Sequence, residues 1–131
     1  MIVLDSSAVI AVALGEADAG KFSDVLGTAE EAVISTGTVV EIGVVLASKN
    51  REGASIDAMH LLAAASVRQI PVSERHALLA IEAYERYGKG RGHPAQLNYG
   101  DCFSYALAKS LNAPLLFKGD DFAQTDVVSA L

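Results

Sequence analysis

The sequence has 131 residues, of which 51% are hydrophobic and 20% charged, so we expect one folded domain over residues 1–131 rather than a disordered chain. Acidic residues outnumber basic ones by 16 to 10, and the net charge of −6 argues against binding of polyanions through surface charge alone. The single cysteine, Cys102, excludes an intrachain disulfide, and neither a secretory signal nor about 18 consecutive apolar residues is visible. These features favour a cytoplasmic protein that does not enter a membrane.

The first half of the chain alternates short apolar runs with stretches of helical spacing. The predicted elements are a strand over residues 1–4, helices over Ala8–Leu14 and Lys21–Leu26, a strand over Ala32–Ser35, and helices over Val39–Ser48 and Ile56–Val67. Ser6 or Ser7 is expected to cap the first helix, and Ser35 or Thr36 the third.

The second half continues this alternation. Its predicted elements are a strand over Gln69–Val72, a helix over His76–Tyr87, a loop over Gly88–Pro94, a helix over Tyr99–Leu111, a strand over Pro114–Phe117, a turn over Gly119–Ala123 and a last short strand over Val127–Leu131. Strands that alternate with helices predict an α/β fold with a short parallel sheet and helices on both faces.

Three acidic residues far apart in the sequence lie in apolar surroundings. Asp5 follows the first strand, Glu41 interrupts a run of aliphatic residues, and Asp101 precedes another apolar run. A carboxylate near a core is costly unless it is paired, hydrogen-bonded or bound to a metal. Three of them suggest convergence on one cation, and hard oxygen ligands favour Mg²⁺ or Mn²⁺.

The predicted topology places these acids at one end of the sheet. Ligands of open α/β sheets bind outside the carboxyl ends of the strands, where Asp5 is expected, together with Asp120 and Asp121 after the last long strand. Glu41 and Asp101 would reach the same place from the first turns of their helices. Such a cluster can hold one or two divalent cations that polarise a phosphate and activate water, which would offset the negative charge of the chain.

Each acid also has a simpler explanation when it is considered alone. Asp5 and Asp101 can cap helices, and Asp120 with Asp121 can form a turn. Glu41 fits an ordinary exposed helix face less well, because its neighbours are apolar. The joint pattern therefore favours a metal site.

Four blocks of sequence carry a family resemblance, in an order that spans nearly the whole chain. The blocks are Val3–Ala8 (VLDSSA), Thr38–Glu41 (TVVE), Leu97–Lys109 (LNYGDCFSYALAK) and Pro114–Phe122 (PLLFKGDDF). Together they resemble the PIN-domain ribonucleases of the VapC toxin type. The resemblance implies a PIN-like three-layer fold and a Mg²⁺- or Mn²⁺-dependent endoribonuclease that is a homodimer, binds a cognate antitoxin and cleaves tRNA or another structured RNA.

The resemblance also implies a role for each acid. Asp5 and Asp101 become the metal ligands, and Glu41 becomes a ligand, directly or through water, or the base for the attacking water. Asp121 becomes the fourth catalytic acid in preference to Asp120, because Gly119 stands where many PIN domains have an acid. This departure leaves open whether one metal or two are bound.

Other functions remain as alternatives from the sequence. A phosphatase could use Asp5 as nucleophile, but it would want a second aspartate where Ser7 stands. A non-catalytic partner-binding domain with a degenerate site is the other alternative. The basic residues Arg86, Lys89 and Arg91 belong either to a solvated loop or to a contact with the RNA backbone.

Overall fold

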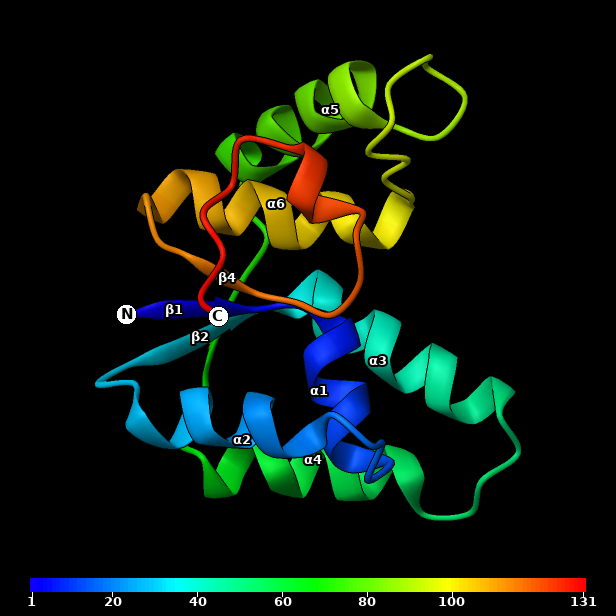
Figure 1. Cartoon of the computed structure of the whole chain (residues 1–131), viewed down its shortest axis with the longest axis vertical. Helices are drawn as coiled ribbons and strands as arrows, with labels where there is room; N and C mark the ends of the chain where they lie inside the picture. Colours follow the sequence, from blue (N-terminus) through cyan, green and yellow to red (C-terminus); the bar gives the residue numbers. More distant parts are fainter.

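The computed structural model describes residues 1–131, and its centre is a sheet of four short parallel strands (Figure 1). The strands are β1 (Ile2–Leu4), β2 (Ala32–Ser35), β3 (Arg68–Ile70) and β4 (Leu115–Leu116), and their order across the sheet is β3-β2-β1-β4. The first strand in the sequence, β1, thus lies between β2 and β4. The chain leaves β1 at the edge of the sheet where the strands have their carboxyl ends. The α/β class and the parallel sheet predicted from the sequence are confirmed.

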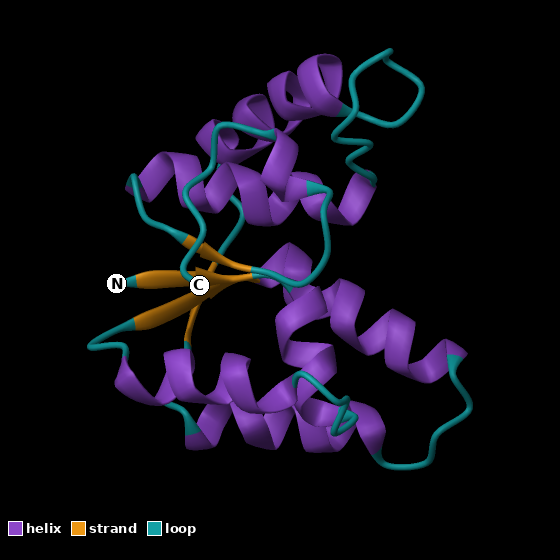
Figure 2. Ribbon diagram, in the orientation of Figure 1, coloured by secondary structure: helices purple, strands orange, loops and turns teal.

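Helices cover both faces of the sheet and make three layers (Figure 2). They are α1 (Ser6–Ala13), α2 (Ala19–Thr28), α3 (Thr36–Ser48), α4 (Ala54–Ala64), α5 (Glu74–Tyr87), α6 (Tyr99–Leu111) and a short 3-10 helix η1 (Phe122–Gln124). Figure 1 shows α5 and α6 above the sheet, with α1, α2 and α4 below it.

Two hydrophobic clusters fill the spaces between these layers. Alternate residues of β1 serve both clusters, because Ile2 and Leu4 pack on the side of α1, α2 and α4 while Val3 packs on the side of α5 and α6. Leu116 and Leu115 divide in the same way in β4. Burial on both faces explains why these strands are continuous apolar runs in the sequence.

Most predicted elements are present with ends shifted by one to three residues, and three differences affect the caps, the site or the sheet. α1 begins at Ser6 with Asp5 as its N-cap, so the capping role predicted for Ser6 or Ser7 is wrong. α3 is capped by Ser35 as predicted, but it begins at Thr36, three residues earlier than expected. The last five residues form no strand, since only one isolated bridge joins Ser129 to Leu115.

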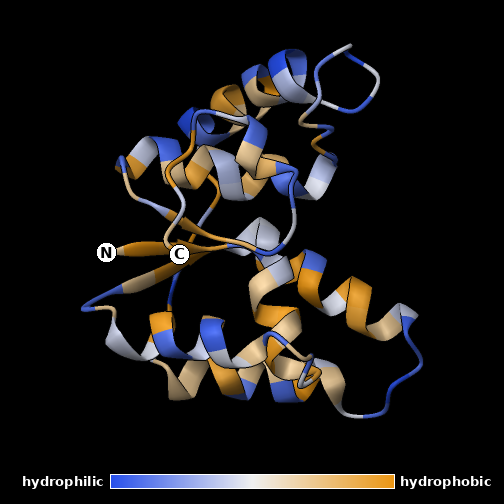
Figure 3. Cartoon of the chain, in the orientation of Figure 1, coloured by the Kyte–Doolittle hydropathy of each residue, from blue (hydrophilic) through white to orange (hydrophobic).

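Hydrophobic and hydrophilic residues alternate along the helices (Figure 3), and some of the hydrophobic ones are exposed. Apolar side chains remain exposed on α3, where Val40 and Val44 are 65% and 64% accessible to solvent. Leu78 of α5 is exposed to a similar degree. None of the helices has the length and apolar character needed to cross a membrane.

Candidate active site

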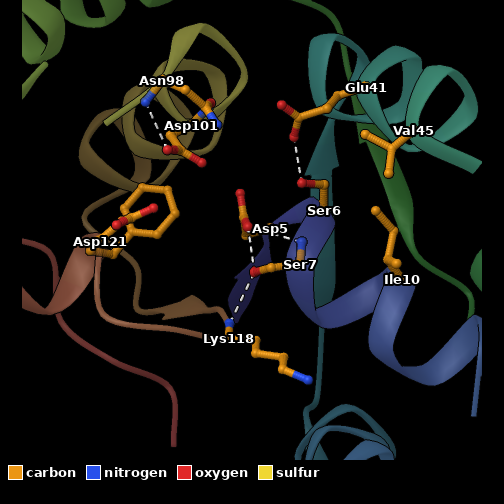
Figure 4. A pocket seen from close by; sticks show the side chains of 11 residues that line it. Asp5, Ser6, Ser7, Ile10, Glu41, Val45, Asn98, Asp101, Lys118 and Asp121 are labelled. Atoms are coloured by element: carbon orange, nitrogen blue, oxygen red, sulfur yellow. Dashed lines mark hydrogen bonds between the residues drawn. The ribbon is translucent and has the colours of Figure 1, made fainter. Parts of the chain in front are cut away.

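A cavity of about 260 Å³ opens beside the end of β1 and collects acidic side chains from four separate segments (Figure 4). Asp5 follows β1, Glu41 comes from α3, Asp101 from α6, and Asp121 from the turn before η1. We call these four side chains the acidic pocket. All four predicted catalytic residues therefore line one cavity, whereas Asp120 is not part of its lining.

Asp5 is the most deeply buried member, with only 1% of its surface exposed. Its Oδ2 accepts hydrogen bonds from the Ser7 amide (2.9 Å) and the Ser7 hydroxyl (2.5 Å), so Asp5 also caps α1. Its Oδ1 accepts a hydrogen bond of 2.6 Å from the Ser104 hydroxyl of α6. The same carboxylate thus caps α1 and faces the cavity, and hydrogen bonds from α1 and α6 hold it in one orientation.

The hydroxyl groups on Asp5 are themselves fixed by the fold. Ser104 is fully buried and lies 3.1 Å from the hydroxyl of Thr38 in α3, which is also fully buried. The Ser7 hydroxyl accepts a hydrogen bond of 2.9 Å from the amide of Lys118, just after β4. The orientation of Asp5 therefore depends on α1, α3, α6 and the segment that follows β4.

Asp101 occupies the first turn of α6, as predicted. Its Oδ2 accepts from the Asn98 amide and the Asn98 side chain accepts from the Asp101 amide, both at 2.9 Å, which forms a reciprocal cap. Burial raises the pKa of Asp101 to about 7, and repulsion from Asp5, Glu41 and Asp121 adds to this effect, while the bond from Asn98 opposes it. The other oxygen, Oδ1, takes part in no hydrogen bond within the chain.

Glu41 lies in the second turn of α3 and not in the first, because the helix begins earlier than predicted. The Ser6 hydroxyl donates a hydrogen bond to its Oε1. Burial raises the pKa of Glu41, and the charge of Asp5 raises it further, whereas the Ser6 bond lowers it. A Cβ built on Gly100 would lie 1.2 Å from Glu41 Oε2, so the carboxylate fits against α6 only because residue 100 is glycine.

The cation nearest the acidic pocket does not neutralise it. Lys118 is the only basic residue of the lining, but its Nζ forms ion pairs with Glu16 (3.2 Å) and Asp18 (3.0 Å). Figure 4 shows its side chain running away from the four carboxylates. The charge of Lys118 is therefore directed to Glu16 and Asp18 and away from the acidic pocket.

The arrangement of the acids limits the kind of metal site that they could form. No group of three or more acidic, histidine or cysteine side chains is close enough to hold one ion together. Mg²⁺, however, usually keeps several waters and is bound by one or two carboxylates. The all-oxygen donor set and the free Oδ1 of Asp101, facing Asp5 across the cavity, fit a hydrated hard cation of this kind.

Several residues that shape the site were not identified from the sequence. Thr38 lies three residues before Glu41 and Ser104 three residues after Asp101, so each shares a helix face with an acid. This spacing could have identified both hydroxyls. Nothing local could have shown that Gly100 faces Glu41, because 59 positions separate these residues in the sequence.

Cys102 is a small buried side chain between the acids and the core. It is 5% exposed, and burial raises the pKa of its thiol to about 11, with further contributions from the charges of Asp101 and Glu41. A thiol in this state is a poor nucleophile.

Comparisons with known proteins agree with this architecture. The ribonuclease VapC28 of Mycobacterium tuberculosis is 43% identical over 130 residues, which cover 99% of this chain and 98% of the relative. The crystal structure of M. tuberculosis VapC20, described as a toxin that cleaves the sarcin–ricin loop, superposes with a TM-score of 0.80 at 18% identity and covers 98% of this chain and 97% of that one. A toxin–antitoxin complex from Klebsiella pneumoniae gives a TM-score of 0.71 at 19% identity over 100% of this chain and 98% of that one.

The family profile described as "PIN domain" matches residues 2–128, which is nearly the entire chain. This match includes all four acids of the pocket and every strand of the sheet. The chain therefore belongs to the PIN domain family, as a member of its VapC group.

Proposed function

We propose that this chain is a Mg²⁺- or Mn²⁺-dependent endoribonuclease that acts as the toxin of a toxin–antitoxin pair. The observation that carries the proposal is the acidic pocket, in which four distant segments of a VapC-group chain bring carboxylates to one cavity. Like charges gathered in this way repel one another, and a bound cation would offset that repulsion. An RNA phosphate would enter this acidic pocket only when a cation is bound there.

Each acid has a proposed role. Asp5 and Asp101 would hold the cation, since the first is fixed by hydroxyls and the second has a free oxygen. A bound Mg²⁺ or Mn²⁺ would polarise the phosphate and make a water molecule more acidic. Glu41 would accept the proton of the attacking water or bind the cation through water, and its raised pKa suits a general base. Asp121, at the exposed rim, would complete the pocket.

Membership of the VapC group also suggests which molecules the chain binds. We propose that residues 1–131 form a single PIN domain that works in the cytoplasm as a homodimer and is inhibited by a cognate antitoxin. The exposed apolar side chains of α3 and α5 support the presence of protein partners. The substrate would be tRNA or another structured RNA.

The two alternative functions receive less support. A phosphatase of this type would want a second aspartate two residues after its nucleophile, but this chain has Ser7 there, and the Ser7 hydroxyl donates to Asp5. A degenerate binding domain would have no reason to retain four carboxylates around one cavity. Metal-assisted hydrolysis of RNA therefore accounts for more of the site.

The decisive experiment is cleavage of mixed structured RNAs by the purified chain in the presence of Mg²⁺, Mn²⁺ or a chelator. Asp5→Asn and Asp101→Asn should abolish cleavage, and so should the chelator. Asp120→Asn is the matched control, because it removes the same charge from an exposed residue outside the cavity lining. Cleavage that persists in both pocket variants, or in chelator, would falsify the proposed mechanism.

A further inference from the structure

The connection between α5 and α6 contains a cationic segment, Gly88–Gly92, which we call the basic turn. No acidic residue occurs between Glu85 and Asp101, although the chain as a whole carries a charge of −6. We propose that Lys89 and Arg91 form a second contact for RNA and hold a phosphate next to the one that enters the acidic pocket. This inference rests on the proposed function, which it extends to a neighbouring part of the substrate.

The basic turn is joined directly to the rim of the acidic pocket. The Lys89 amide donates to the Leu97 carbonyl (2.8 Å), and the Leu97 amide donates to the Tyr87 carbonyl (2.9 Å). Leu97 precedes Asn98, which lines the cavity and caps α6 at Asp101. Lys89 is therefore connected to Asn98 by one hydrogen-bonded pair, Lys89 with Leu97, and one peptide bond. This corresponds to about 10 Å or less between the Cα atoms of Lys89 and Asn98.

Hydrogen bonds fix the shape of the basic turn. The Tyr84 hydroxyl donates to the Lys89 carbonyl (3.0 Å), and Arg91 Nε donates to the Glu85 carbonyl (3.3 Å). Gly90 and Gly92 adopt positive φ values of 85° and 79°, which only glycine accepts readily. The two cations are thus presented from an ordered segment. Figure 1 shows this segment as a loop at the end of α5, above the start of α6.

The two cations also remain available for a ligand. Lys89 and Arg91 are exposed and take part in no ion pair, whereas Arg86, Lys109 and Lys118 each pair with a carboxylate of the chain. Arg91 uses only its Nε within the chain, so its two terminal nitrogens can bind a phosphate. A strand of RNA that enters the negative pocket would gain attraction from these cations just outside it.

The test is equilibrium binding of a short, labelled, single-stranded RNA of mixed sequence, measured by fluorescence anisotropy in Mn²⁺ as a function of KCl. For these binding measurements wild type and all variants carry Glu41→Gln, which removes the proposed general base, so that the RNA stays intact. The double variant Lys89→Ala/Arg91→Ala should bind on the order of tenfold more weakly at about 0.15 M salt. The plot of log affinity against log salt should also become shallower by about 0.7, because the two side chains hold one phosphate and each phosphate contact contributes about 0.7 for a single strand. Titration with Mn²⁺ in the absence of RNA should give the wild-type affinity.

The matched control is Lys49→Ala/Arg51→Ala, which removes two exposed and unpaired cations from the turn between α3 and α4. This control should keep the wild-type affinity and salt slope. If the basic-turn variant matches wild type in both measurements while wild type binds and cleaves RNA, the second contact is refuted and the proposed function stands. If wild-type protein neither binds nor cleaves RNA, both proposals fail together.

Discussion

Replacement of Asp101 by asparagine should make the metal-free protein more stable while it abolishes activity. Asparagine has the same shape as aspartate, and its Oδ1 can still accept the Asn98 amide that completes the helix cap. The substitution removes a charge that is 8% exposed and that lies near three other carboxylates. The charge of a proposed metal ligand is therefore expected to destabilise the fold when no metal is bound.

The size of the effect follows from the raised pKa. Burial and the neighbouring acids raise the pKa of Asp101 from its ordinary value of 3.8 to about 7. The folded state therefore binds a proton more tightly than the unfolded state, so this group lowers the free energy of unfolding as the pH rises from about 4 to 7. At about 1.36 kcal/mol per pKa unit, Asp101→Asn should gain on the order of 4 kcal/mol at about pH 8 and less than about 1 kcal/mol at about pH 4.

The assay is urea unfolding, followed by circular dichroism in chelator at several pH values. Asp120→Asn serves as the control, because residue 120 is exposed and its charge lies outside the cavity lining. Addition of Mn²⁺ should stabilise the wild-type chain more than the Asp101 variant, since only the former keeps both proposed ligands. An Asp101→Asn chain that is no more stable than wild type at high pH, or whose gain does not change with pH, would refute the reasoning.

Three further predictions concern the surroundings of the acids. Gly100→Ala should displace the Glu41 carboxylate and lower the cleavage rate. It should cost little stability, because alanine favours helix over glycine by about 1 kcal/mol. The control Gly43→Ala, with nothing within 4 Å of the new methyl group, should leave the cleavage rate unchanged. Ser104→Ala should weaken Mn²⁺ binding, measured by calorimetry, by a factor of about 10 to 100, because the Asp5 carboxylate loses the hydrogen bond that orients its Oδ1. An unchanged affinity would show that Ser104 does not position Asp5. Mn²⁺ affinity should fall as the pH drops below about 7, where protons compete for the α6 carboxylate, and an affinity independent of pH would contradict its place among the ligands.

The sequence was sufficient to predict the sheet and the position of most of the acids. Asp5 directly follows a buried apolar run, and Asp101 stands three residues after Asn98 in the pattern of a helix cap. These signals are local, since they depend on burial of a strand and on satisfaction of the first amides of a helix. For this reason the two proposed metal ligands could be placed without knowledge of the fold.

The errors arose where distant contacts outweigh local preference. Thr36, Gly37 and Thr38 favour helix weakly, so the pattern predicted that α3 would begin later. In the structure Gly37 packs closely against the ring of Phe103, and Thr38 bonds Ser104, which extends the helix toward its N-terminus. The same extension places Glu41 in the second turn.

The C-terminal segment shows a similar limit. Residues 127–131 have the apolar character of a strand, but only Ser129 is bridged to β4. Asp126 immediately before them bonds the Tyr105 hydroxyl (2.8 Å) and Lys109 (3.0 Å) of α6, which directs the chain across the helix before it reaches the sheet. Hydropathy alone contains no information about this anchor.

The way in which Asp5 is held has a kinetic consequence. Its oxygens are oriented by serine groups of the chain, so the ligand geometry is established during folding and does not await the arrival of an ion. The slow step of metal loading should then be the loss of water from the cation and not a rearrangement of the protein. Because Mg²⁺ releases its water reluctantly, Mn²⁺ should bind to the metal-free pocket faster than Mg²⁺.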